Sequence, residues 1–162
     1  MRRASRVLFL AVVAAGPAHA QETALASLAG KYCGFVPGFD ERSSYVHYTV
    51  PMDLTLSPDG AYSASLGREG ALPKTINGKS SLAADTLRLK PGLVKSVGPK
   101  DAAAVSEVEL RVVRWGTRVY LVPLESLSVF CKTKAESLDN CSIWSFVRAD
   151  DLKKPRGTGP PC

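Results

Sequence analysis

The run from Val108 to Val122, VELRVVRWGTRVYLV, is the longest stretch of this 162-residue chain with one consistent structural pattern. In its first half Val108, Leu110 and Val112 alternate with Glu109, Arg111 and Val113, which is the period-two pattern of a strand with one buried face. The second half, Val119 to Val122, is β-branched and aromatic, as strands often are. Gly116 lies between the halves and suits the first central position of a type II′ turn, which needs a positive φ. The run therefore predicts a β-hairpin that ends near Pro123, because proline cannot donate a hydrogen bond to a sheet.

Strand patterns recur on both sides of this hairpin. A second hairpin is predicted around residues 57–60, SPDG, where proline and glycine occupy the turn positions that suit their backbones. A third is predicted over residues 77–92, with turn signals at Asn77-Gly78 and Ala84-Asp85, and a long loop from Leu93 to Ala104 follows it. Further strands are expected at Lys31–Val36, Tyr45–Val50 and Ile143–Val147.

Two short helices complete the predicted secondary structure. Residues 22–30, ETALASLAG, offer Thr23 as an N-cap and Gly30 as a C-terminal stop. The sequence after Pro123, LESLSVFCKTKA, places apolar residues at helical spacing, although part of it also alternates as a strand would. The predicted fold is mostly β: an antiparallel meander that forms a small barrel or half-barrel, with a short N-terminal helix and a short helix after the central hairpin.

Residues 1–20 have the three-part pattern of a secretory signal peptide. Arg2, Arg3 and Arg6 precede an apolar block, and the segment ends in Ala-His-Ala. The block is about half as long as the roughly 20 residues of a membrane-spanning helix. We therefore expect cleavage after Ala20, a periplasmic or extracellular location, and no transmembrane segment in the mature chain.

The exported portion, residues 21–162, has the size of one domain. We predict a single β-rich domain over residues 21–149 and an extended tail over residues 150–162, which are rich in proline and polar residues. Without the signal peptide, 18 basic residues face 15 acidic ones, so the net charge falls from +6 to +3. The basic residues are interleaved with acidic ones and do not form the clustered stripe of a nucleic-acid-binding protein. No nucleic-acid partner is expected.

All four cysteines lie in the exported portion. An even number of cysteines in an oxidising compartment predicts two disulfides, which four cysteines can form in three pairings. We favour Cys131 with Cys141, which closes a small loop, and Cys33 with Cys162, which holds the tail. A zinc site is the alternative, but there is no CxxC pair and His47 is the only histidine outside the signal peptide. We expect neither a metal nor another cofactor.

Two resemblances accompany these patterns. A short helix, then Gly30-Lys31-Tyr32, then hairpins and a late helix resemble the plan of the lipocalins and other calycins, with Tyr32 in place of the tryptophan of the lipocalin Gly-x-Trp motif. The segment WGTRVYLVP at Trp115–Pro123, followed by Phe130-Cys131, is similar to a run in uncharacterised exported bacterial proteins. The second resemblance implies export and a strand-strand-helix order, and no activity.

The first functional hypothesis is a binding protein whose barrel interior or mouth takes a small apolar or amphipathic molecule. The aromatic residues expected near such a site are Tyr62, Trp115, Tyr120 and Trp144, and packing in the core is the alternative role for each. Trp115 has the parity of Val113, opposite to Leu110, so we expect its side chain to be exposed.

The rival hypothesis is an envelope protein-protein interaction module or inhibitor that acts through loops. Arg114 and Arg118, which flank the central turn, and the Leu93–Ala104 loop would then make the contacts. An enzyme is the least favoured class, because no carboxylate pair, nucleophile motif or phosphate-binding loop stands out. No catalytic residue is predicted.

Overall fold

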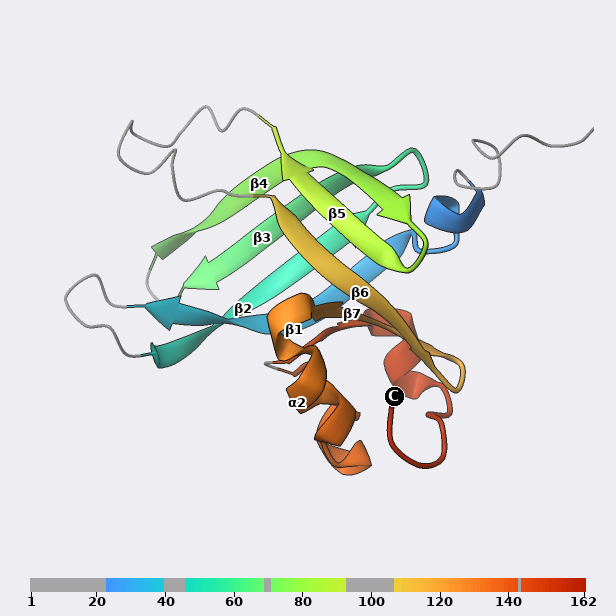
Figure 1. Ribbon diagram of the computed structural model, residues 1–162. Coiled ribbons are helices and arrows are strands. Elements are labelled where there is room, and N and C mark those ends of the chain that lie inside the picture. The colour runs from blue at the N-terminus through green and yellow to red at the C-terminus, as the bar shows by residue number, and fades with distance from the viewer. Residues whose placement is uncertain (1–22, 40–45, 69–70, 93–106, 143) are drawn as a thin grey trace, which may run out of the picture.

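The computed structural model describes residues 23–39, 46–68, 71–92, 107–142 and 144–162 (Figure 1). Side chains are described over these ranges except at residues 36–39, 46–51, 66–68 and 71–74. The predicted signal peptide, the Leu93–Ala104 loop and the side chain of His47 lie outside the described residues.

The eight described strands form a closed antiparallel barrel. Each strand pairs with the next one in the sequence, and β8 pairs with β1 to close the ring. The strands are β1 (Gly30–Phe39), β2 (Val46–Leu56), β3 (Ala61–Arg68), β4 (Ala71–Ala83), β5 (Thr86–Pro91), β6 (Val108–Trp115), β7 (Arg118–Pro123) and β8 (Phe146–Arg148). The predicted mostly β meander is confirmed, and it closes into a full barrel.

The described side chains inside the barrel form one apolar cluster, because every second residue of each strand points inward. Its buried members from the strands are Tyr32, Leu54, Leu56, Tyr62, Ala64, Leu82, Leu87, Leu89, Leu110, Val119, Leu121 and Phe146. Residues 23–26 form the predicted N-terminal helix, and Leu25 and Leu28 pack against this cluster at one end. The Tyr32 hydroxyl donates a hydrogen bond to the Leu28 carbonyl at 2.7 Å, which holds that segment over the end of the barrel. We call this end, where β1 begins, the N-terminal end of the barrel.

Both of the best-defined hairpins are confirmed. The turn at residues 57–60 joins β2 to β3, and Gly60 has φ +80°. Gly116 joins β6 to β7 with φ +63°, as a type II′ turn requires of its first central residue. A Cβ atom at Gly116 would also come within 2.5 Å of the Gly157 backbone nitrogen, so the position has no room for a side chain.

The turn predicted at Asn77-Gly78 is wrong, because both residues lie inside β4. Gly78 pairs with Tyr62 across the sheet, and a Cβ atom there would lie 2.5 Å from the Tyr62 ring and 2.2 Å from the Lys90 carbonyl oxygen. Glycine is therefore required for close packing rather than for a turn. The other predicted turn, Ala84-Asp85, does join β4 to β5.

Ala84 is strained in this turn, with φ +52°. A left-handed backbone costs a residue with a Cβ atom about 1–2 kcal/mol, whereas glycine adopts it freely. We expect Ala84→Gly to raise the free energy of unfolding by about 1 kcal/mol in denaturant melts. The neighbouring Ala83→Gly, at a position without a positive φ, should instead lower it. Equal effects of the two substitutions would contradict the assigned turn.

A second apolar cluster lies on the outer face of the barrel, over β7 and β8. Its buried members are Trp115, Tyr120, Val122, Phe130, Leu138 and Val147. Helix α2 (Leu127–Lys132) follows the 3₁₀ helix η2 (Leu124–Ser126) and lies below the barrel in Figure 1, beside the C-terminal segment. The 3₁₀ helix η3 (Ala135–Leu138) follows α2. The short helix predicted after the central hairpin is confirmed.

The predicted disulfide pairing is wrong: Cys33 bonds to Cys141, and Cys131 bonds to Cys162. The chain before β8 runs beside β1, where the Phe35 amide donates to the Ser142 carbonyl at 3.0 Å, and this brings Cys141 to Cys33. Cys131 on α2 instead meets the end of the chain. Closeness in sequence therefore misled the prediction.

The C-terminal residues pack against the barrel. The predicted domain boundary at residue 149 falls at the start of the 3₁₀ helix η4 (Ala149–Lys153), so the segment predicted as an extended tail begins inside a helix. Asp151 is fully buried, accepts the Val119 amide at 2.9 Å and pairs with the Lys154 ammonium at 2.6 Å. Cys162 ties down the end of the chain.

Candidate functional site

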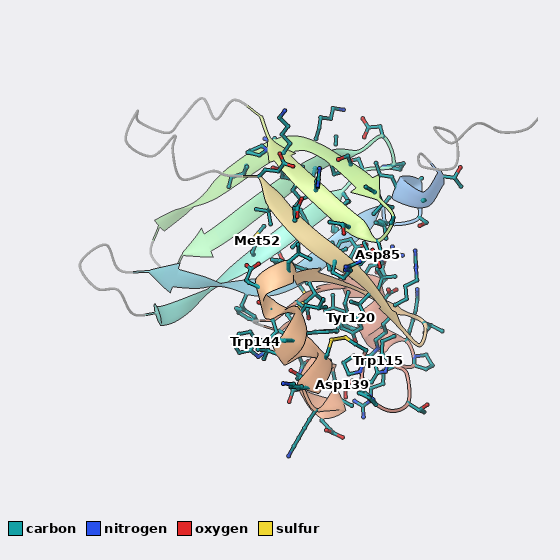
Figure 2. All side chains as sticks on the ribbon, in the orientation of Figure 1. Met52, Asp85, Trp115, Tyr120, Asp139 and Trp144 are labelled. Atoms are coloured by element: carbon teal, nitrogen blue, oxygen red, sulfur yellow. A yellow bond between two sulfur atoms is a disulfide. The ribbon has the colours of Figure 1, made fainter. Side chains whose placement is uncertain are left out.

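The four aromatic residues predicted near a ligand are not brought together. Tyr62 lies inside the barrel, whereas Trp115 and Tyr120 lie in the outer cluster with their ring centroids 6.3 Å apart. Trp144 is 36% exposed at the surface (Figure 2). Among these residues the structure therefore offers no shared cavity.

The expected exposure of Trp115 is wrong, since its side chain is only 5% exposed. The side chain does lie on the predicted face of the strand, the outer one, because it belongs to the outer cluster with Val113. The C-terminal segment covers it: a Cβ atom at Gly157 would lie 2.2 Å from the indole ring. The indole is thus a packing surface for the end of the chain.

Arg118 is also buried, at 6% exposure, which contradicts its predicted role as a contact residue at the turn tip. Its guanidinium pairs with the Asp139 carboxylate at 3.0 Å. It also donates to three backbone carbonyl oxygens, those of Leu138, Leu152 and Lys154. The guanidinium groups of Arg156 and then Arg118 hold the pKa of Asp139 below its ordinary value. Arg118 therefore joins the central hairpin to the segments packed outside the barrel.

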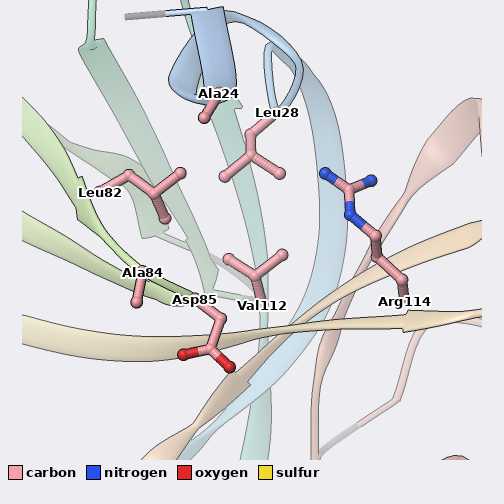
Figure 3. Close-up of a pocket in the computed structure, with 7 residues that line it drawn as sticks. All are labelled: Ala24, Leu28, Leu82, Ala84, Asp85, Val112 and Arg114. Atoms are coloured by element: carbon pink, nitrogen blue, oxygen red, sulfur yellow. The ribbon is translucent and has the colours of Figure 1, made fainter. Parts of the chain in front are cut away.

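A pocket of about 320 Å³ opens at the N-terminal end of the barrel. Its walls come from the N-terminal helix and the residues after it, from β4 and the β4–β5 turn, and from β6. The lining residues, shown in Figure 3, are Ala24, Leu28, Leu82, Ala84, Asp85, Val112 and Arg114. Five of the seven are apolar, so the pocket combines an apolar surface with one acid and one base.

The acid of the pocket is already neutralised. Asp85 forms an ion pair with Arg111, which does not line the pocket. Arg114 is exposed, and its hydrogen-bond partner is the Ser27 hydroxyl, at a long 3.4 Å. Arg114 is thus the charged group of the pocket that remains available to a ligand.

A second guanidinium group, that of Arg148, also contacts Ser27. Arg148 donates to the Ser27 carbonyl at 2.6 Å and to the Tyr32 hydroxyl at 3.2 Å, and its guanidinium carbon is 5.6 Å from the centre of the Tyr32 ring. Burial raises the pKa of Tyr32, against the opposing effect of Arg148, so the hydroxyl stays protonated and supplies no negative charge. The surroundings of Ser27 are therefore positive.

No family model, curated protein or solved structure matches the chain. Over the described residues, none of the helices has the length and apolar character needed to cross a membrane. The assignment of the site therefore depends on its own geometry.

Of the residues that line the pocket, Arg114 was predicted from the sequence as a functional residue, for contacts with a partner protein, and the other six were not predicted. The signal that could have found the pocket is parity, because Arg114 continues the inward series of Leu110 and Val112 along β6. The contributions of Ala24 and Leu28 had no such signal, since they depend on how the N-terminal segment folds over the barrel.

Proposed function

We propose that this chain is an exported, non-catalytic binding protein whose pocket at the N-terminal end of the barrel takes a small apolar or amphipathic molecule. The observation that supports this most is the pocket itself, whose volume of about 320 Å³ lies near the lower bound of ligand sites, roughly 300–1,000 Å³. Such sites are mostly apolar with a few polar groups that orient the ligand, as here. We assign the ligand to this pocket at the mouth of the barrel, since the described interior side chains next to it pack against one another.

The proposed export agrees with two further observations. Two disulfides are formed and no described cysteine is free, as expected in an oxidising compartment. The signal pattern of residues 1–20 supports the same route. The resemblances to the calycin plan and to exported bacterial proteins stay predictions.

The alternative, an envelope interaction module, is supported by a different surface. Three large apolar residues outside the barrel strands remain exposed: Leu124 at 40%, Val129 at 41% and Trp144 at 36%. Exposed apolar side chains of this kind occur in protein interfaces. Arg118 no longer supports this function, because its side chain is buried.

The pocket can be tested by filling it. Ala24 lines the pocket from the N-terminal helix, so Ala24→Trp should occupy its volume and weaken binding of a neutral naphthylamine fluorophore at least about tenfold. Ala26 is exposed on the same helix and does not line the pocket, so Ala26→Trp is the matched control and should bind like the parent protein. Fluorescence titration of the mature protein, with excitation outside the tryptophan band, measures both.

Two outcomes would contradict the proposal. One is the absence of saturable binding of any apolar probe to the parent protein. The other is equal weakening by the two tryptophan substitutions, which would show that the probe binds elsewhere. Binding of a protein partner that is lost on Val129→Asp, with the probe unbound, would support the interaction module instead.

A further inference from the structure

We infer that the molecule bound in this pocket is an amphiphile with a single carboxylate, whose head group pairs with Arg114 while its apolar part lies against Leu28, Leu82 and Val112. This inference rests on the proposed binding function and adds the chemical class of the ligand. It starts from the balance of charge around the pocket.

Arg114 is one of two described arginine side chains that lack a carboxylate partner among the described residues. The others each form an ion pair: Arg88 with Glu109, Arg111 with Asp85, Arg118 with Asp139, and Arg156 with Glu136 and Asp139. The second exception is Arg148. Both exceptions contact Ser27, so two guanidinium groups without a carboxylate partner among the described residues lie close together beside the pocket.

The two guanidinium groups have different roles in this arrangement. Arg148 is committed to the Ser27 carbonyl and the Tyr32 hydroxyl, although its buried Nε has no hydrogen-bond partner in the described structure. Among the described residues, the Arg114 side chain contacts only the Ser27 hydroxyl, at the long distance of 3.4 Å, and it is exposed. Arg114 can therefore turn its donors to a ligand, and Arg148 adds to the positive potential without moving.

The apolar walls of the pocket indicate that the rest of the ligand is apolar. Leu28 and Leu82 are buried, and Val112 lies between Asp85 and Arg114 in the close-up of Figure 3. A hydrophilic anion would leave this surface against water, whereas a chain or ring attached to the carboxylate would cover it. A cationic amphiphile is disfavoured, because Asp85 is already paired with Arg111.

Three ligands that share one tail and differ in head group can separate the contribution of the head group to the affinity from that of the tail. Decanoate and decylammonium below their micelle concentrations, and decanol below its solubility limit, are titrated calorimetrically into the mature protein at neutral pH and low salt. Decanoate is expected to bind at least about tenfold more tightly than decanol, because its carboxylate can form a charge-assisted hydrogen bond with Arg114. Decylammonium should bind most weakly, and added salt should weaken decanoate more than decanol.

Substitution of the arginine assigns the preference to a residue. Arg114→Gln should abolish the advantage of decanoate over decanol, and Arg114→Lys should keep part of that advantage. Arg88→Gln is the matched control, because it removes the same charge from an exposed arginine that pairs with Glu109 and does not line the pocket. Arg88→Gln should preserve the order of affinities for the three ligands.

The outcomes separate this inference from the proposed function. Equal affinities for decanoate and decanol, or a preference that survives in Arg114→Gln, would overturn the carboxylate while binding in the pocket stood. Failure of every ligand and of the naphthylamine probe to bind would overturn the proposed function and this inference with it. Decanol binding that Ala24→Trp abolishes, together with decanoate preference lost in Arg114→Gln, would support both.

Discussion

Replacement of both Cys33 and Cys141 by serine is expected to lower the free energy of unfolding by about 5 kcal/mol. The two cysteines are 108 residues apart, so their disulfide restricts the unfolded chain more than the disulfide between Cys131 and Cys162, which spans 31 residues. In the chain-entropy model the shorter crosslink contributes about 4 kcal/mol. Denaturant melts of the two double-serine variants should therefore rank them in this order.

The first disulfide also lies where the barrel closes. Strand β8 is three residues long and joins β1 through two pairs of residues, Tyr32 with Arg148 and Cys33 with Val147. Without the disulfide, the amide hydrogens of β8 should exchange with solvent before those of the β6–β7 hairpin. A peptide map of the parent protein that shows another pairing, or a Cys131/Cys162 variant that is clearly less stable than the Cys33/Cys141 variant, would contradict this account.

The sequence was sufficient for the architecture because the barrel is built from local pairings. Each hairpin joins neighbouring strands, and the alternation of residues in runs such as Val108–Trp115 reports the two faces of one strand. The turns at residues 57–60 and at Gly116 were predictable because their backbones need the residues found there. Closure between β1 and β8 leaves no such local signal, and the prediction therefore remained open between a barrel and a half-barrel.

The errors share a different physical origin, which is contact between segments distant in sequence. Trp115 looked exposed because its parity is outward, yet residues 156 and 157 fold over that face. Asn77-Gly78 was predicted as a turn from its residue types. The Tyr62 ring, whose close packing requires glycine at position 78, is 16 positions away in the sequence and gave no local signal. The pocket was missed for the same reason, since the N-terminal segment and the β4–β5 turn meet only in the folded barrel.

Arg114 and Arg118 flank the same turn, yet contacts with segments distant in sequence bury only Arg118. Arg118→Gln is expected to lower the free energy of unfolding by about 3 kcal/mol. Glutamine is too short and has too few donors to replace the contacts to Asp139 and to the carbonyls of Leu138, Leu152 and Lys154. Loss of four contacts from a side chain that is only 6% exposed is the main cost, although the Leu138 carbonyl keeps the Tyr120 hydroxyl as a donor at 3.4 Å.

Arg114→Gln is the matched control for Arg118→Gln, because Arg114 lies on the other side of the same turn and is exposed. Its unfolding midpoint in denaturant should stay close to that of the parent protein, while its preference for decanoate is lost. Arg118→Gln should show the reverse: a lower midpoint and, under conditions where it is folded, an unchanged order of ligands. An Arg118→Gln variant as stable as the parent protein would mean that the C-terminal segments are held by other contacts, and the guanidinium would then be free for the surface role first predicted for it.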